Sequence, residues 1–146
     1  MNAVQAIQAS GASCGDRSER MKDGTLPNIC IVDDDEAVRG ALRLLVRSFG
    51  WQARSFSSAR EFLEALPEGK PDCLLLDLNM PEMNGAELQE RLASQGISIP
   101  VIVITGQKDL KLLARSRAAG ARALISKPFQ DEELKACIEQ ALYSTH

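Results

Sequence analysis

Five polar residues stand at the ends of short apolar runs in this sequence, and their types suit one kind of chemistry. They are Asp33, Asp34, Asp77, Thr105 and Lys127. Neighbouring carboxylates repel each other, so a group of three favours a hard divalent cation with oxygen ligands, a description that Mg²⁺ fits. A hydroxyl and an ammonium can hold the remaining oxygens of a phosphoryl group. Together these residues supply the chemical groups that phosphoryl transfer to a carboxylate nucleophile requires.

The elements that must position these residues follow a regular pattern. Predicted strands at 28–32, 52–56, 73–76, 101–105 and 121–125 are each followed by apolar residues with helical spacing. Five strand–helix alternations predict an α/β fold, in which a parallel sheet carries helices on both faces. The first, third and fourth strands are continuously apolar, which favours central positions, whereas the second and fifth are more polar and favour the edges.

The sheet edge is where the five polar residues are expected to meet. In open α/β sheets, ligands bind beyond the carboxyl ends of the strands, where the strand order reverses. Each residue taken alone has a simpler interpretation, as a turn residue, a strand end or a surface charge. Convergence of all five on one edge is what favours Asp77 as a functional residue.

Local signals predict where several helices begin and end. Gly50 favours a left-handed end to the first helix, and Ser58 with Glu61 predicts a capping box at the start of the second. Asp35 is expected to stabilise the N-terminus of the first helix. Gly85 is expected to ease the turn into the third helix.

Composition limits the class of protein. The 146 residues suit one domain, and the 45% hydrophobic and 25% charged fractions are ordinary for a globular chain. A formal net charge of -3 argues against direct nucleic-acid binding. Four cysteines without a C-x-x-C pair, together with a single histidine, argue against a tetrahedral zinc site. Cys30 and Cys73 lie in apolar runs and are predicted to be buried thiols, as in a reducing cytosol.

The chain divides into a predicted tail and a predicted domain. Residues 1–27 are rich in Ala, Ser, Gly and Gln without sustained periodicity, which predicts a flexible N-terminal tail, and residues 28–146 form the domain. Met21 is an alternative translation start. Neither a membrane-spanning stretch nor a signal peptide is evident, so a cytoplasmic location is expected. No output domain is expected after the last helix.

Four motifs together resemble the receiver domain of bacterial two-component response regulators. They are Ile31-Val32-Asp33-Asp34-Asp35, Leu75-Leu76-Asp77-Leu78-Asn79-Met80-Pro81-Glu82-Met83-Asn84-Gly85, Val103-Ile104-Thr105-Gly106 and Lys127-Pro128-Phe129. They occur in the family's order and approximate spacing, from about residue 28 onward. The resemblance implies a flavodoxin-like (βα)5 fold with strand order 2-1-3-4-5.

The resemblance also implies roles for the residues of the site. Asp77 would be the phosphorylated aspartate of a two-component phosphorelay, and Lys127 and Thr105 would contact its phosphoryl group. The ligands of Mg²⁺ would be Asp33, Asp34, Asp77 and the backbone carbonyl of Asn79, with Asp33 acting through water. The family often has a cis peptide between this lysine and the proline that follows it.

The resemblance implies partners as well. The phosphoryl donor would be a sensor histidine kinase or a histidine phosphotransfer protein, and phosphorylation would change the binding of a downstream protein target. A phosphorylation-dependent dimer is possible, whereas contact with a membrane or direct contact with nucleic acid is not expected. The domain would catalyse its own phosphorylation and dephosphorylation without being an enzyme that acts on a diffusible substrate.

Some positions depart from the family or leave two interpretations open. Leu124 stands where the family usually has Tyr or Phe, which points to a modified switch through the fourth helix. Asn79 and Gln107 occupy positions that tune the lifetime of the acyl phosphate. Arg39, Arg43 and Arg47 recur every four residues along the first helix; these arginines form either a solvated face or a docking stripe for the kinase.

Three other functions are alternatives to this one. A haloacid-dehalogenase-like phosphatase needs a second Asp two residues after the nucleophile, and Asn79 occupies that position. A flavin-binding module needs a phosphate-cradling loop after the first strand, where this chain has acidic residues. The third alternative is the receiver portion of a transcriptional regulator whose DNA-binding domain lies outside this chain.

Overall fold

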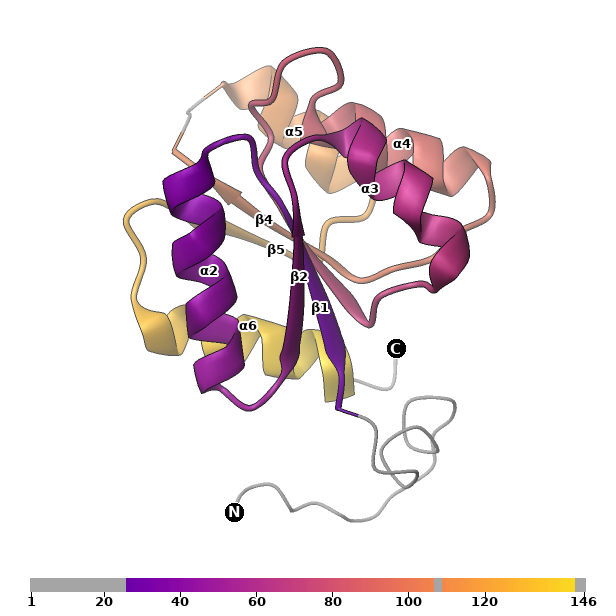
Figure 1. Cartoon of the computed structure of the whole chain (residues 1–146). Helices are drawn as coiled ribbons and strands as arrows, with labels where there is room; N and C mark the ends of the chain where they lie inside the picture. The colour runs from indigo at the N-terminus through magenta and orange to yellow at the C-terminus, as the bar shows by residue number, and fades with distance from the viewer. Residues whose placement is uncertain (1–25, 107–108, 144–146) are drawn as a thin grey trace.

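Strand and helix alternate along the described part of the chain, as the sequence predicts. The computed structural model describes residues 26–106 and 109–143. Its elements are β1 (Asn28–Val32), α2 (Glu36–Ser48), β2 (Gln52–Phe56), α3 (Ala59–Ala65), the short 3-10 helix η1 (Leu66–Glu68), β3 (Cys73–Leu76), α4 (Gly85–Ser94), β4 (Val101–Thr105), α5 (Leu110–Ala118), β5 (Ala123–Ser126) and α6 (Asp131–Tyr143). Figure 1 shows these helices arranged around one twisted sheet.

The five strands form one parallel sheet in the order β2-β1-β3-β4-β5. This arrangement confirms the predicted fold, with the three apolar strands at the centre and the two more polar strands at the edges. The fifth strand begins at Ala123, two residues later than predicted. Ala121 instead donates its N–H to the carbonyl of Ser116 and closes the end of α5, so it is not available to the sheet.

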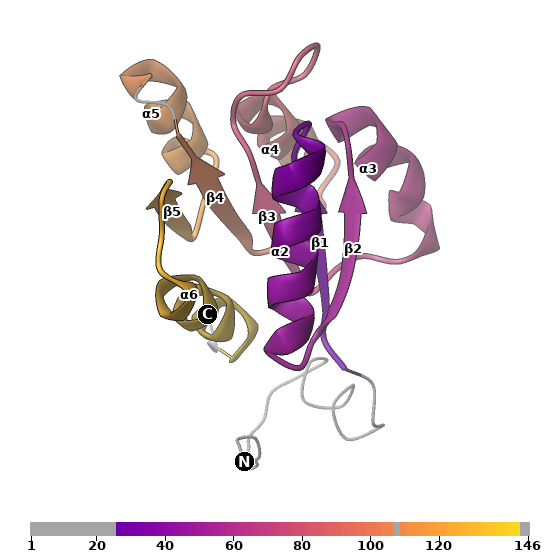
Figure 2. The same cartoon turned by 60° about the vertical axis from the view of Figure 1, so that its left-hand side comes forward.

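Helices cover both faces of the sheet. The helices α2 and α6 lie on one face and α3, α4 and α5 on the other, as Figures 1 and 2 show. Successive residues of a strand point to opposite faces, so Ile29 and Ile31 pack toward α2 and α6, while Cys30 and Val32 pack toward the other layer. The two apolar clusters hold the sheet rigidly between the helices and fix the positions of the strand ends.

The predicted thiols are buried, but on different faces. Cys30 belongs to the cluster under α3, α4 and α5, and Cys73 belongs to the cluster under α2 and α6. Both are free. Burial raises the pKa of the Cys30 thiol to about 11, so this thiol remains protonated.

The predicted helix ends are largely confirmed. Gly50 follows α2 with φ of 101°, the left-handed geometry that favours glycine. The Ser58 hydroxyl accepts the N–H of Glu61 at 3.1 Å. The predicted reciprocal bond of the capping box, from the backbone N–H of Ser58 to Glu61, is wrong. The Glu61 carboxylate accepts instead from the backbone N–H and the hydroxyl of Ser57.

Several predictions fall on parts of the chain outside the described residues. They are the flexible tail, apart from its last two residues, the alternative start at Met21 and the role of Gln107. Among the described helices, none is long and apolar enough to cross a membrane.

Candidate functional site

Three carboxylates meet at the carboxyl ends of β1 and β3. These strands are neighbours in register, with Val32 opposite Leu76, so the residues that follow them share one edge of the sheet. Carboxylate oxygens of Asp33, Asp34 and Asp77 all lie within 4.8 Å of one another. The predicted acidic cluster is thereby confirmed. Asp33 and Asp77 are buried, whereas Asp34 is exposed and leaves the cluster open to solvent.

Asp33 is held from three directions. Its Oδ1 accepts the backbone N–H of Asp35 at 2.9 Å, and its Oδ2 lies 3.6 Å from the Nζ of Lys127. Arg39 donates from its guanidinium to the backbone carbonyl of Asp33 at 2.9 Å. The lysine expected to bind a phosphoryl group therefore pairs here with one of the carboxylates of the site.

Asp77 carries an unfavourable charge. Its backbone N–H donates to the carbonyl of Val32 at 3.0 Å, and its Oδ1 accepts the N–H of Asn79 at 3.3 Å. Burial and, to a smaller extent, the nearby charges of Asp33 and Asp34 raise the pKa of the Asp77 carboxyl to about 6, against the opposing effects of the Asn79 N–H and Lys127. The carboxylate is thus destabilised when ionised, which favours any cation or covalent group that removes its charge.

Gly85 allows α4 to begin directly against Asp77. A Cβ atom at this position would lie 2.7 Å from the carbonyl oxygen of Asp77 and 2.9 Å from the side chain of Leu78. The glycine is therefore required for this close approach, which is a stronger constraint than the eased turn expected from the sequence.

Thr105 and Lys127 reach the same edge through β4 and β5. Thr105 pairs in register with Ser126, and its carbonyl accepts the backbone N–H of Lys127 at 2.9 Å. Thr105 is buried, whereas the Lys127 side chain is half-buried. The peptide bond between Lys127 and Pro128 is cis, as the family resemblance implies. All five predicted residues are therefore brought to one end of the sheet.

The donor set of the cluster fits a hard divalent cation. All its potential ligand atoms are carboxylate oxygens, and three such groups stand beside the single ammonium of Lys127. Asn79 follows two residues after Asp77 and is exposed, so the loop after β3 borders the cluster. The acidic cluster can therefore hold a metal ion.

A strained residue in the loop between β3 and α4 escapes prediction from the sequence. Glu82 has φ of 70°, in the left-handed region that disfavours residues with a Cβ. It is the one described residue other than glycine with positive φ. A glutamate gives no sequence signal for this geometry, so only the structure reveals the strain.

The arginine stripe of α2 contacts the sheet and is not simply a solvated face. Besides the bond from Arg39 to Asp33, Arg43 donates to the Ser55 hydroxyl at 2.7 Å and Arg47 donates to the Ala53 carbonyl at 3.3 Å. Two of the three arginines thereby tie the helix to the edge strand β2. The docking interpretation stays a prediction.

Leu124 lies under α5. It pairs in register with Val103 and is half-buried in the apolar cluster that also receives Leu112 and Leu113 of α5. The residue at the family's usual aromatic position therefore packs as an ordinary aliphatic side chain between the sheet and this helix.

Known proteins share both the sequence and the fold. A family model described as response regulator receiver domain matches residues 29–139. The response regulator protein TmoT of Ectopseudomonas mendocina is 45% identical over 114 residues, which cover 78% of this chain and 52% of TmoT. The transcriptional regulatory protein FixJ of Bradyrhizobium diazoefficiens is 36% identical over 118 residues, which cover 81% of this chain and 58% of FixJ. The chain therefore spans about half the length of these curated relatives.

Solved structures of receiver domains share the fold of this chain. The crystal structure of FixJ-N superposes with a TM-score of 0.75 at 37% identity and covers 81% of this chain and 94% of that one. A CheY-like response regulator receiver domain protein from Methanospirillum hungatei superposes with a TM-score of 0.76 at 30% identity, with the same two coverages of 81% and 94%.

Proposed function

Because this chain belongs to the response regulator receiver domain family, we propose that it accepts a phosphoryl group on Asp77 from a phosphohistidine partner. The observation that carries the proposal is the placement of Asp77. Its carboxylate is buried and has a raised pKa, and it lies within 4.8 Å of two further carboxylates. Thr105 and Lys127 lie at the same edge of the sheet. The four sequence motifs that match the family supply the residues at this edge.

Asp77 acts as the nucleophile. One of its oxygens forms a bond to phosphorus as the bond between phosphorus and the donor's ring nitrogen breaks. A carboxyl pKa of about 6 leaves the group mostly ionised at neutral pH, as a nucleophile requires. The backbone N–H of Asn79, already directed at Oδ1, holds the carboxylate in position for attack.

The acidic residues would hold Mg²⁺. The ligands would be the side chains of Asp34 and Asp77, with Asp33 supporting and the carbonyl of Asn79 completing the set, as in the family. When bound, the cation neutralises charge on the incoming phosphoryl oxygens.

Lys127 and Thr105 contact the phosphoryl group once it is in place. The Lys127 ammonium leaves its 3.6 Å pairing with Asp33 and turns to a phosphoryl oxygen, and the Thr105 hydroxyl donates to another.

Phosphorylation would alter the surface that a partner protein recognises. The donor would be a sensor histidine kinase or a phosphotransfer protein, and a cytoplasmic location and a phosphorylation-dependent dimer stay predictions. We regard the domain as a switch and not as an enzyme that acts on a diffusible substrate. Asn79, which cannot serve as a carboxylic acid, argues against the phosphatase alternative, and the acids after β1 argue against a flavin phosphate at that position.

A second candidate is the receiver portion of a transcriptional regulator. The relatives favour it, because FixJ is named a transcriptional regulatory protein and this chain matches 58% of its length. The reading frame downstream of residue 146 distinguishes the two candidates: a basic helix-turn-helix segment there would support the second.

The test is exposure of the chain to acetyl phosphate with Mg²⁺, followed by intact mass measurement. We expect a single phosphoryl adduct that is lost in Asp77→Asn and absent when Mg²⁺ is removed by a chelator. The matched control is Asp72→Asn, at the opposite end of β3, where the carboxylate accepts the N–H of Asn28 at 2.8 Å. The control should phosphorylate normally; an adduct that persists in Asp77→Asn would overturn the assignment.

A further inference from the structure

Arg39 contacts the backbone of the acidic turn that follows β1. It lies near the start of α2, its side chain is half-buried, and its guanidinium donates to the backbone carbonyl of Asp33 at 2.9 Å. The bond therefore runs from the helix back to the turn that precedes it. Arg39 is placed to control the geometry of this turn, a role that the helical spacing of the arginines does not indicate.

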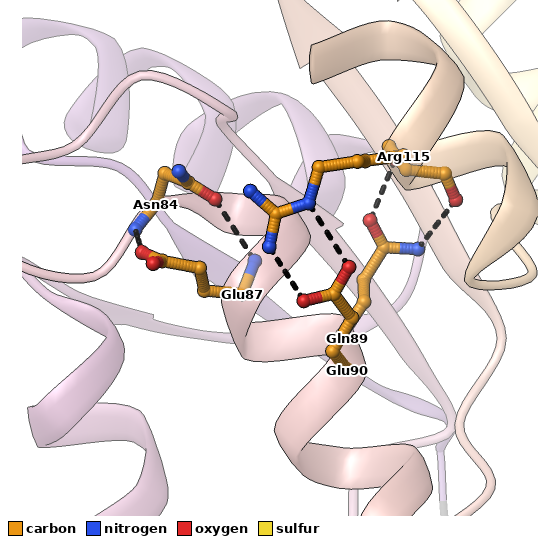
Figure 3. A network of polar contacts seen from close by, with 6 residues as sticks. Asn84, Glu87, Gln89, Glu90 and Arg115 are labelled. Atoms are coloured by element: carbon orange, nitrogen blue, oxygen red, sulfur yellow. Dashed lines mark hydrogen bonds and ion pairs between the residues drawn. The ribbon is translucent and has the colours of Figure 1, made fainter. Parts of the chain in front are cut away.

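The acceptor of this bond is a carbonyl and not a carboxylate. Three carboxylates lie at the same end of the sheet, and an arginine commonly pairs with such groups. The chain forms a pair of that kind elsewhere, where Arg115 of α5 donates to both oxygens of Glu90 of α4, at 3.1 and 2.6 Å (Figure 3). Because Arg39 binds the backbone instead, it leaves the carboxylate oxygens of the acidic cluster available to a cation.

Both peptide groups of Asp33 are fixed by residues outside the turn. Its N–H donates to the carbonyl of Phe56, at the end of β2, at 3.2 Å, and its carbonyl accepts from Arg39. The peptide unit is planar, so a carbonyl held in one direction fixes the plane between residues 33 and 34. The same plane sets the direction in which the Asp34 side chain leaves the backbone.

The Asp34 carboxylate depends on this backbone for its position. Within residues 26–106 and 109–143, no hydrogen bond or ion pair holds it, whereas Asp33 and Asp77 each accept a backbone N–H. Asp34 is exposed, yet it lies within 4.8 Å of both. An exposed side chain without such a bond samples several rotamers, so the direction of the backbone decides whether it reaches the cluster.

We propose that Arg39 is a positioning residue for the cation site, which holds the peptide between Asp33 and Asp34 so that the Asp34 carboxylate faces Asp77. The inference rests on the proposed function, because it concerns the residues that would hold Mg²⁺. Residues that orient metal ligands typically change metal affinity by about 10- to 100-fold when they are removed.

The sign of the effect separates positioning from simple electrostatics. Arg39 carries a positive charge beside the acidic cluster, and such a charge opposes the binding of a further cation. If the charge alone mattered, its removal would strengthen the binding of Mg²⁺. If the hydrogen bond positions Asp34, its removal weakens the binding. The two roles therefore predict opposite changes in the dissociation constant.

The test is titration of the full chain with MgCl₂ by isothermal calorimetry, in wild type, Arg39→Met and Arg47→Met. Methionine keeps an unbranched stem but has neither the charge nor the donors of arginine. Arg47→Met is the matched control, because Arg47 also donates to a backbone carbonyl, that of Ala53 at 3.3 Å, but near the other end of α2. Urea unfolding of the three proteins checks that each is folded.

The expected change is specific to Arg39. Arg39→Met should bind Mg²⁺ about tenfold more weakly than wild type, while Arg47→Met stays within about twofold. Arg39→Lys, which keeps the charge and can donate a single bond to the carbonyl, should lie between wild type and Arg39→Met. The initial rate of phosphorylation by acetyl phosphate should fall in Arg39→Met at low Mg²⁺ and return close to that of wild type at saturating Mg²⁺.

Three results of the titration would overturn the proposal. They are unchanged or tighter Mg²⁺ binding in Arg39→Met, an equal weakening in Arg47→Met, and a wild-type chain that binds no Mg²⁺. A rate that stays low in Arg39→Met at saturating Mg²⁺ would likewise reject a role through the cation. A wild-type chain that binds Mg²⁺ but takes up no phosphoryl group would refute the proposed function alone, and the affinities of the variants would still decide whether Arg39 positions the site.

Discussion

The two helices that flank β5 are held in place by different interactions. The helix α6 buries four residues, Leu134, Ile138, Ala141 and Leu142, against the sheet. The helix α5 fully buries only Ser116, which forms a hydrogen-bonded pair with Gln89 of α4, and it packs the half-buried Leu112 and Leu113 against the sheet. Apolar burial is non-directional and strong, whereas a buried hydrogen-bonded pair is directional and contributes less. The contrast suggests a fixed element on one side of β5 and an adjustable one on the other.

The carboxyl edge of the sheet, like α5, is less stably held than α6. Its acidic cluster, the raised pKa of Asp77 and the left-handed backbone of Glu82 all cost stability. Sites that must react or move are expected to be less than optimally stable. Substitutions should therefore destabilise the protein on the α6 side and, at two positions of the edge, stabilise it.

The largest effect is expected on the α6 side. Leu134 is fully buried, so Leu134→Ala should lower the free energy of unfolding by about 3 kcal/mol, through lost burial and the cavity left behind. Urea unfolding followed by fluorescence of the buried Trp51 measures this change. The matched control is Leu44→Ala, because Leu44 is 69% exposed and its loss should cost less than about 0.5 kcal/mol. Equal losses at both positions would contradict the account of α6.

The second effect has the opposite sign. Asp77→Asn should raise the free energy of unfolding by about 1.5 kcal/mol at pH 7 in the presence of a chelator, after allowance for partial screening by solvent. The folded-state pKa of Asp77, about 6, lies above the value of about 4 expected in the unfolded chain, so the folded state binds the proton more tightly.

The pH dependence follows from this sign. The wild-type chain should lose stability as the pH rises through about 6, and the advantage of Asp77→Asn should vanish below about pH 4, where the carboxyl is protonated in both states. Urea unfolding at a series of pH values measures the difference. If Asp77→Asn were less stable than the wild type at pH 7, the ionised Asp77 carboxylate would not destabilise the folded state as predicted.

The fold was largely predictable from the sequence because its strands and helices are marked by strong local patterns. The apolar run that ends at Asp77, for example, is both a buried strand and a pointer to the site. The Gln89–Ser116 pair was not predictable, since a glutamine and a serine 27 positions apart carry no signal that they meet. Equally, the spacing of Arg43 is the same whether its side chain is solvated or bonded to Ser55. The role of Leu124 in switching stays a prediction.

The third effect measures the polar anchor of α5. Ser116→Ala and Gln89→Met should each lower the free energy of unfolding by about 1 kcal/mol, and the double variant should cost less than their sum because both remove the same contact. A double-mutant cycle in urea gives the coupling energy. Strict additivity would show that the pair contributes nothing beyond the two separate side chains, and α5 would then need another anchor.

The smallest effect concerns the loop after the site. Glu82→Gly should raise the free energy of unfolding by about 0.5 kcal/mol, since relief of the left-handed strain exceeds the entropy that glycine adds to the unfolded chain. Glu87→Gly, in the first turn of α4, is the control and should destabilise, because it removes the carboxylate that accepts the backbone N–H of Asn84 at 2.9 Å and places glycine in a helix. Thermal unfolding resolves the two signs. Loss of stability in Glu82→Gly would mean that the side chain makes a contribution larger than its backbone strain.

The proposed function of this domain depends on an acyl phosphate at Asp77. Borohydride reduction of the chain after treatment with acetyl phosphate and Mg²⁺, followed by peptide mapping, tests this directly, because an aspartyl phosphate is reduced to homoserine whereas a phosphorylated hydroxyl is not. We predict homoserine at position 77 and unmodified residues at positions 33 and 34. Homoserine at either of those positions, or a phosphoryl group that survives on Thr105, would contradict the account.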